Sequence, residues 1–401
     1  MALEIAALRA HFPSLQSGIA HFDGPGGTQT PTAVGEAILR TITGPLSIRG
    51  SATVSERNAE ECVAGFRSAI ADLLGDDGRG VVHGRSATQL TYDFSRHLAT
   101  TWAPGDEVVV SRLDHDANVR PWIQAAVAAG ATVRWIDFDP ATAEIDPGSV
   151  AGAITERTRL VAITAASNLL GTIPPVRAIA DAAHAVGALV YIDGVHYTAH
   201  SAVDVSALGA DFFVCSPYKF LGPHCGVLVA APELLESLHP DKLLPSTDVV
   251  PERFEFGTLP YEILAGVTAA VEFLAAIAPG DAIGRRARLL ASAQAVHEHE
   301  LALRTRLESG LAALGDEVTV HSRARDRTPT LLVTFASHAS ADASRFLAER
   351  DVLAPAGSFY AREAFDRLGL EDSAGLRIGV APYTDEEDVD RLLAALAEFL
   401  A

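Results

Sequence analysis

Residues 188–222 read ALVYIDGVHYTAHSAVDVSALGADFFVCSPYKFLG and contain two short apolar runs, each followed by a charged residue. The first run ends at Asp193, and the second, which ends at Cys215, is followed by Lys219. Taken singly, an aspartate at a strand end is more often a cap or turn residue, and a lysine more often reaches solvent. The pair is more informative, because two opposite charges at the ends of successive buried strands indicate a site for chemistry.

The same alternation of apolar runs and helical patterns covers about residues 65–230. Between the runs lie stretches such as 176–187, with apolar residues at i, i+3 and i+4 and a glycine at the end. Strands separated in this way predict βαβ units and a mostly parallel sheet that is covered on both faces, with the chemistry at the carboxyl ends of the strands. The candidate strands lie at residues 107–111, 132–138, 159–167, 188–193, 211–216 and 226–231.

The pattern changes after residue 280, where a long amphipathic helix pattern is followed by short strands and a closing helix. This predicts a small α+β unit, joined in space by the N-terminal helix. A chain of 401 residues also exceeds the usual size of one hydrophobic core. We therefore predict a large domain over residues 18–280 and a small domain built from 1–17 and 281–401.

Composition argues against several kinds of partner. The net charge is −20 and no Lys/Arg cluster occurs, which disfavours nucleic acid and anionic membranes. No apolar run approaches the roughly 18 residues that span a bilayer, and no signal peptide is indicated. Cys62, Cys215 and Cys225 form no CxxC pair, which is typical of a reducing cytoplasm, and Cys215 is expected to pack as a small hydrophobe. The pair His224–Cys225 lacks further ligands, so no metal site is expected.

Asp193 and Lys219, with Ser216 and Tyr218 between them, match the needs of pyridoxal 5'-phosphate (PLP). A lysine amine forms a Schiff base with the PLP aldehyde, and an aspartate keeps the ring nitrogen protonated so that the ring can accept electrons from a substrate. A dinucleotide is not expected, because no G-x-G-x-x-G follows a strand. The sequence therefore predicts PLP as the cofactor.

A phosphate-binding turn is predicted where a short strand passes into a helix that begins near Thr88. The free N–H groups of Ser86, Ala87 and Thr88, at the positive end of the helix dipole, would bind the phosphate. The hydroxyls of Ser216 and Tyr218 would close the site from the other side.

Further polar residues follow other predicted strands. His115 is expected to stack on the cofactor ring or to shuttle a proton, and Asn168 to hydrogen-bond the ring hydroxyl. Arg377 lies within an apolar strand, which suggests bidentate binding of a substrate carboxylate worth about 1.5–3 kcal/mol. Gly26 and Gly27 are interpreted as a tight turn that contacts the substrate, because the stretch lacks the lysine of a P-loop.

Seven stretches occur in the order and spacing of one family: HFDGPGGTQTP, GDEVVVSRLDHDANVRPW, SNLLGTIPPV, YIDGVHYTAH, DFFVCSPYKFLGP, FEFGTLP and RIGVAPYTDEEDVDRL. Through them the chain resembles, over nearly its whole length, the class V aminotransferase family and within it the cysteine desulfurase-like proteins. The resemblance implies an α/β protein of PLP-dependent transferase fold type I. It implies a mixed, mostly parallel seven-stranded sheet in the large domain, and a small α+β C-terminal domain. It also implies the PLP roles given above, and a homodimer in which Thr258 reaches the cofactor phosphate of the partner.

The chain departs from the desulfurase pattern at residues 355–361, PAGSFYA. Desulfurases of this group carry a persulfide cysteine there, in a motif resembling R-x-G-H-H-C-A. Tyr360 stands in place of that cysteine and Pro355 in place of the arginine, and a phenol cannot accept sulfur. His196 stands where many relatives have a glutamine, and Ala52 replaces a histidine. The reaction is therefore expected to differ.

The predicted reaction is that of a PLP-dependent lyase acting on an amino acid through a Cα carbanion. We expect β-elimination with cleavage of the carbon–sulfur bond of cysteine or a cysteine conjugate, without a protein persulfide. Lys219 would remove the Cα proton, Arg377 would bind the carboxylate, and His196 or Tyr360 would protonate the leaving group. An aminotransferase, an epimerase and a decarboxylative carbon–carbon bond enzyme remain alternatives. So does a non-catalytic partner protein of the same fold, although the retained lysine and aspartate argue against it.

Overall fold

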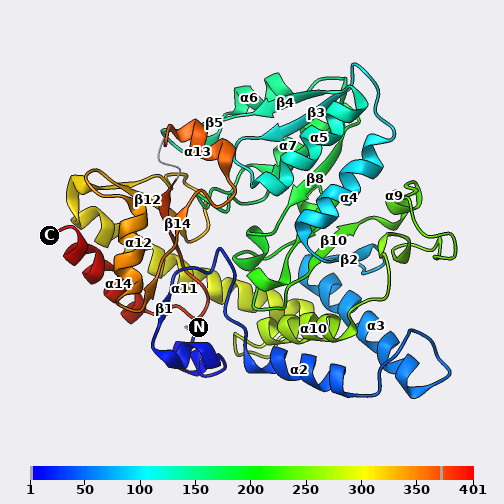
Figure 1. Ribbon diagram of the computed structural model, residues 1–401, viewed down its shortest axis with the longest axis horizontal. Coiled ribbons are helices and arrows are strands. Elements are labelled where there is room, and N and C mark those ends of the chain that lie inside the picture. Colours follow the sequence, from blue (N-terminus) through cyan, green and yellow to red (C-terminus); the bar gives the residue numbers. More distant parts are fainter. Residues whose placement is uncertain (1–2, 371–373) are drawn as a thin grey trace.

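A seven-stranded sheet forms the centre of the larger part of the molecule in the computed structural model, which describes residues 3–370 and 374–401 (Figure 1). The sheet order is β2-β10-β9-β8-β7-β3-β4; β10 is antiparallel to both of its neighbours, and the pairs from β9 to β4 are parallel. The mixed, mostly parallel seven-stranded sheet that the sequence predicts is confirmed. Its strands are β2 (Val81–Gly84), β3 (Glu107–Ser111), β4 (Thr132–Ile136), β7 (Thr158–Thr164), β8 (Leu189–Asp193), β9 (Phe212–Cys215) and β10 (Gly226–Ala230).

Helices cover both faces of this sheet, which explains why its central strands are apolar throughout. Val109 packs into one core, and its neighbours Val108 and Val110 pack into the core on the opposite face. The first face is covered by α3 (Val54–Leu74), α7 (Val176–Ala185) and α10 (Tyr261–Ala275), and the second by α4 (Ala87–Ala99) and α5 (Arg120–Ala129). The remaining helices and strands before residue 281 are α1 (Ile5–Arg9), α2 (Thr32–Thr43), α6 (Pro147–Ala153), α8 (Val205–Leu208), α9 (Pro232–Glu236), β5 (Phe138–Asp139) and β6 (Glu144–Ile145), besides β1, which is described below.

Two strands end earlier than the sequence predicts, because the chain turns directly after them. The strand expected over 159–167 ends at Thr164, because the chain turns there: the Thr164 hydroxyl donates to the carbonyl of Ala166 at 2.8 Å. The strand expected over 132–138 ends at Ile136, and the chain then enters the small β5–β6 hairpin. These turns bring the residues that follow the strands to the carboxyl edge of the sheet.

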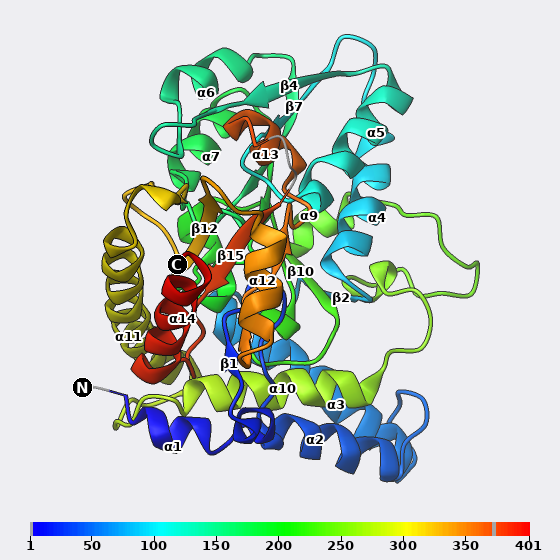
Figure 2. The ribbon, with the colours of Figure 1, turned by 60° about the vertical axis from the view of Figure 1, so that its left-hand side comes forward.

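The C-terminal unit has an antiparallel sheet of order β11-β12-β15-β14, with α11, α12 and α14 packed around it (Figure 2). Leu303, Leu331, Ile378 and Leu392 lie in its separate core. Its elements are α11 (Arg285–Ala313), β11 (Val318–Val320), β12 (Thr330–Phe335), α12 (Ser340–Ala348), β13 (Val352–Leu353), β14 (Ala356–Gly357), β15 (Gly375–Gly379) and α14 (Glu386–Phe399). Helix α13 (Arg362–Leu368), between β14 and β15 in the chain, packs instead into the core of the larger unit through Ala364 and Phe365.

An N-terminal strand joins this C-terminal unit. Strand β1 (Ala20–His21) pairs in parallel with β13, and Asp23 bridges to Gly379. Figure 1 shows β1 beside the C-terminal elements. The predicted domain boundary at residue 18 falls just before β1, so the short segment after it packs with the C-terminal unit. At Thr28, whose N–H donates to the carbonyl of Tyr218 at 3.0 Å, the chain passes to the larger unit. None of the described helices combines the length and apolar character needed to cross a membrane.

Candidate active site

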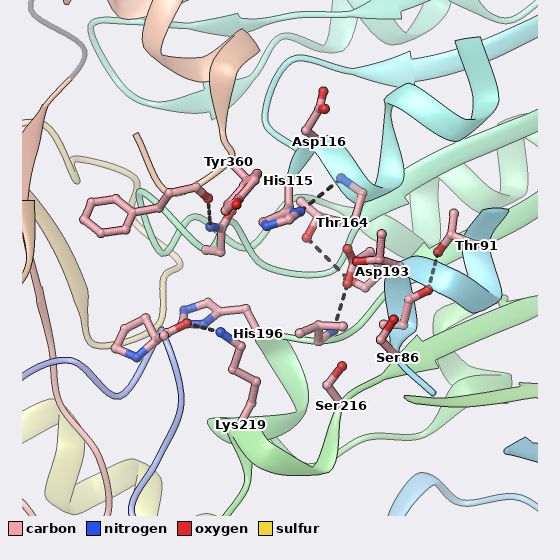
Figure 3. Close-up of a pocket in the computed structure, with 18 of the residues that line it drawn as sticks. Ser86, Thr91, His115, Asp116, Thr164, Asp193, His196, Ser216, Lys219 and Tyr360 are labelled. Carbon is pink, nitrogen blue, oxygen red and sulfur yellow. Dashed lines mark hydrogen bonds between the residues drawn. The ribbon is translucent and has the colours of Figure 1, made fainter. Parts of the chain in front are cut away.

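A cavity of about 650 Å³ lies at the carboxyl ends of the parallel strands, with walls from both units (Figure 3). Segments far apart in the sequence meet here: the turns after β7, β8 and β9, the start of α4, and β15. A volume of this size suits a cofactor together with a small substrate. Thirteen of the predicted site residues line it: Gly26, Ser86, Ala87, Thr88, His115, Asn168, Asp193, His196, Ser216, Tyr218, Lys219, Tyr360 and Arg377.

Two predicted site residues do not line the cavity. Thr258 is exposed, in the segment before α10. Gly27 packs beside the cavity instead: a Cβ added to it would lie 3.4 Å from the ring of Tyr218. The glycine turn therefore contacts the cavity through Pro25 and Gly26.

Lys219 ends a short 3₁₀ turn after β9, and its environment favours the neutral amine. Burial and the charge of Arg377 lower the pKa of Lys219 to about 7, although Asp193 acts in the opposite direction. Its Nζ donates to the carbonyl of Pro25 and lies 5.0 Å from the centroid of the Tyr218 ring. At neutral pH a large fraction of this amine is unprotonated, which is the form that attacks an aldehyde or removes a proton.

Asp193 ends β8 and is buried at the floor of the cavity. Burial raises its pKa to about 6, opposed by a 2.9 Å hydrogen bond from the N–H of Val195 to Oδ1 and by the charge of Lys219. The following residue has to be glycine, because a Cβ on Gly194 would lie 1.9 Å from the ring of Phe213. The carboxylate is therefore held in a position where a cationic ring N–H can pair with it.

The N-terminus of α4 forms an anion site in the wall. Ser86 is the N-cap, and its Oγ accepts from the N–H of Gln89 at 3.1 Å, which leaves earlier N–H groups of the helix for a ligand. Thr91 and Tyr92, one turn along the helix, also line the cavity. Neither was predicted from the sequence, although their spacing of three and four residues from Thr88 places them on the same helix face.

Arg377 on β15 lines the cavity and has one buried donor without a partner in the described chain. Its Nη1 donates to the carbonyl of Asn168 at 3.0 Å, and its Cζ lies 3.8 Å from the centroid of the Phe359 ring. Its Nε and the Oδ1 of Asn168 are buried and have no partner among the described residues. Burial lowers the pKa of Arg377 to about 9, so it is a cation at neutral pH. A buried cation with a free N–H is suited to a carboxylate.

The loop at the mouth of the cavity adopts an unusual backbone conformation. Phe359 and Tyr360 both have positive φ, 54° and 56°. Asp116 donates its N–H to the carbonyl of Tyr360 at 2.7 Å, and the Tyr360 ring stacks on His115 with centroids 5.4 Å apart (Figure 3). Two consecutive left-handed residues without glycine store strain of the kind found at functional sites. No pattern in the sequence marks Phe359 as a wall residue.

His115, beneath this loop, is a neutral imidazole at neutral pH. Burial lowers its pKa to about 4, with a smaller effect of Lys219. Its Nδ1 accepts from the N–H of Ala117 at 3.0 Å, so the proton is on Nε2. Tyr360 stacks on the His115 ring, and no contact of the described residues tests the predicted stacking of His115 on the cofactor. That stacking therefore stays a prediction.

Arg120, another wall residue that the sequence did not reveal, joins the start of α5 to α13 at the mouth. Its Nη2 lies 2.9 Å from Asp116 Oδ1 and 3.2 Å from Glu363 Oε1 on α13. Glu363 also pairs with Arg112 at 3.2 Å. Sequence could not reveal this link, because it depends on the approach of α13 to the start of α5.

His196 lies deeper in the wall. Its Nε2 lies 2.9 Å from Thr328 Oγ1 and 3.1 Å from Thr330 Oγ1, and its Nδ1 is buried without a partner in the described chain. Burial, helped by neighbouring His200, lowers the pKa of His196 well below its ordinary value. The imidazole is therefore neutral.

None of the three cysteines, all of which lie in the described part of the chain, lines the cavity. Cys215 and Cys225 are buried in the core, and burial raises the pKa of the Cys225 thiol to about 12 and that of Cys215 further. Cys62 lies on α3, outside the cavity wall. Within residues 3–370 and 374–401, no three His, Cys, Asp or Glu side chains form a group suited to a metal ion.

The residues present suit PLP. A neutral buried amine and a buried carboxylate lie at the ends of adjacent strands, and the anion site of α4 opens into the same cavity. The unpaired Nε of Arg377 remains for a substrate. Each of the groups that the cofactor requires is therefore available in one space.

Comparison with known proteins gives the same assignment. The aminotransferase class-V family profile matches residues 20–392. An uncharacterized protein of Mycobacterium tuberculosis is 32% identical over 99% of each chain, and a cysteine desulfurase of Dickeya dadantii is 30% identical over 98% of this chain and 96% of that protein. The crystal structure of the cysteine desulfurase CsdA from Escherichia coli superposes with a TM-score of 0.87 at 27% identity, covering 99% of this chain and 98% of that one. This chain therefore belongs to the class V aminotransferase family of PLP-dependent enzymes.

Proposed function

We propose that the protein is a lyase that cleaves the carbon–sulfur bond of cysteine or a cysteine conjugate by β-elimination, without forming a persulfide on the protein. The observation that carries this proposal is the cavity wall: it keeps an amine, a carboxylate and a free guanidinium N–H, and it contains no thiol. At the mouth, where the resemblance implies a persulfide cysteine, Tyr360 stacks on His115. The relatives called cysteine desulfurases support a sulfur-containing amino acid as substrate.

The charge and protonation state of each side chain indicate its role in the proposed elimination. Lys219, Asp193 and the N-terminus of α4 would hold PLP, which supplies an electron acceptor for negative charge at the substrate Cα. Arg377 binds the substrate carboxylate, and the neutral amine of Lys219 takes the Cα proton. His196 gives a proton to the leaving sulfur, and the exposed phenol of Tyr360 is the second donor for this step.

The test is to supply the PLP-loaded protein with L-cysteine and S-alkyl cysteines and to measure thiol or sulfide, pyruvate and ammonia. Equal amounts of the three products over many turnovers support elimination. Stoichiometric persulfide on the protein during turnover of cysteine would refute the proposal. A requirement for an added keto acid would indicate transamination. Formation of the D-amino acid would indicate epimerisation, and release of carbon dioxide would indicate a decarboxylative reaction.

We also propose a homodimer in which Thr258 reaches the partner's cofactor phosphate. In support, Thr258 is exposed, and large apolar side chains are exposed nearby in sequence at Leu243, Leu244 and Phe256. Burying such side chains against a second copy would remove them from water. Sedimentation of the protein and of Leu244→Asp tests this: a wild-type monomer at micromolar concentration would exclude the dimer. The cytoplasmic location expected from cysteine usage remains part of the proposal.

A further inference from the structure

A small second cavity, of about 20 Å³, lies just below the surface of α11. Its wall includes the exposed His297 and is otherwise polar on several sides. A space of this volume has room for one water molecule, provided that polar groups are there to bind it. The polar residues that line it are His200, Glu300, Arg304, Arg327 and Thr328.

Several polar atoms around this cavity lack a partner. Glu300 is only 1% exposed; its Oε2 lies 2.9 Å from His200 Nδ1, but its Oε1 has no partner among the described residues. The same is true of the buried Nε atoms of Arg304 and Arg327. A buried polar atom without a hydrogen bond costs about 1–3 kcal/mol, so an ordered water in the cavity would be strongly favoured.

Thr328 connects this cavity to the catalytic one. Its hydroxyl lies 2.9 Å from His196 Nε2, and Thr328 also lines the small cavity. His196 lines the catalytic cavity, which Thr328 does not reach. The imidazole and the hydroxyl therefore form a polar link between the two spaces.

This polar link would supply the second proton that His196 needs in order to act as an acid. Because the pKa of His196 is lowered far below its ordinary value, the ring is neutral and carries a single N–H proton. A neutral imidazole can give up that proton only if its other nitrogen receives one, since an imidazolate anion is too basic to form here. Nε2 has the Thr328 hydroxyl beside it, so the second proton has a source.

We propose that Thr328 and one buried water, held by Glu300, form a proton relay that resupplies His196, an inference that rests on the proposed β-elimination. As the carbon–sulfur bond breaks and its electron pair stays on sulfur, Nδ1 of His196 gives its proton to sulfur. Nε2 takes the Thr328 hydroxyl proton, Thr328 takes one from the water, and the water takes one from solvent near the exposed His297. Glu300 holds the water in place as a hydrogen-bond acceptor.

The kinetic test compares two leaving groups. Thr328→Val keeps the side-chain shape but removes the hydroxyl, and kcat/KM should fall by about 10²-fold for a conjugate that releases an alkanethiol. For a conjugate that releases a nitrothiophenol, whose thiolate leaves without a proton, the fall should be threefold or less. Thr328→Ser should restore the alkanethiol rate. The matched control is Thr334→Val, which removes a hydroxyl 2.8 Å from His321 Nε2 on the neighbouring strand β12 and should change neither rate.

Equal losses on both substrates, or no loss on either, would overturn the relay. If the wild-type protein releases no thiol from either conjugate, the proposed function fails instead. A second readout does not depend on turnover: a high-resolution crystal structure should show a water within about 3.2 Å of Glu300 Oε1 and of Thr328 Oγ1. A dry cavity would refute the relay whatever the reaction is.

Discussion

Replacing Lys219 by methionine should stabilise the cofactor-free protein at neutral pH, although it removes the residue on which the chemistry depends. In the folded protein, burial and Arg377 lower the pKa of Lys219 from 10.5 to about 7. In the unfolded chain the amine has its ordinary pKa, so folding at neutral pH either buries a charge or releases a proton. Burial of the charge and release of the proton both cost free energy. Methionine has a similar length and no charge, so the variant folds without either cost.

The size and the sign of the effect follow from proton linkage. Because the folded pKa is below the unfolded one, the unfolded state binds more protons between pH 7 and 10.5, and the stability of the wild-type protein rises with pH across that window. At 1.36 kcal/mol for each pKa unit, the penalty removed by Lys219→Met is about 4 kcal/mol at pH 7 and about 1 kcal/mol at pH 10. Asp193 loses a cationic neighbour in the variant, which subtracts part of this gain. The quantity to compare is therefore the gain in stability from Lys219→Met at pH 7 and the same gain at pH 10.

Urea unfolding of the cofactor-free wild-type and variant proteins at pH 7 and pH 10 measures this difference. NMR of protein labelled with ¹³C at the lysine ε position measures the pKa directly, because the chain has two lysines, Lys219 and Lys242. Lys242→Met assigns the second signal and controls for the loss of a lysine outside the cavity. A Lys219 signal that titrates near 10.5, or a stability difference that is equal at both pH values, would refute the reasoning.

Three further changes test other parts of the site. Arg377→Gln should raise KM for amino-acid substrates about 10- to 100-fold, from the loss of a charge-assisted bond, and an unchanged KM would mean that the carboxylate binds elsewhere. Ser86→Ala should lower the free energy of unfolding by about 1 kcal/mol through loss of the helix cap and should weaken PLP binding in an equilibrium titration; tight binding of PLP would count against the anion site. Glu363→Gln should make the loop at Tyr360 more sensitive to proteolysis, whereas Asp366→Asn, an exposed change on the same helix, should not; equal sensitivity would exclude the link through Glu363.

The sequence was most informative where buried strands end in polar residues. Asp193 and Lys219 line the predicted cavity because parallel strands place their carboxyl ends at one edge, a rule that needs no knowledge of the loops. Strand ends were less accurate: Thr164 stops its strand through a local side-chain hydrogen bond that has no periodic signal. Phe359 and Arg120 were missed for a related reason. One is placed by a left-handed backbone, and the other is defined by a contact with a helix more than 200 residues away.

The pairing of β1 with β13 places the Pro25 turn between the two units. Through the Asp23–Gly379 bridge the turn is joined to the unit that carries Arg377, and through the carbonyl of Pro25 it accepts a hydrogen bond from Lys219 of the larger unit. The turn therefore sets the spacing between the guanidinium proposed to bind a carboxylate and the amine proposed to take the Cα proton. Selection for amino acids would then depend on this spacing as well as on the two separate contacts.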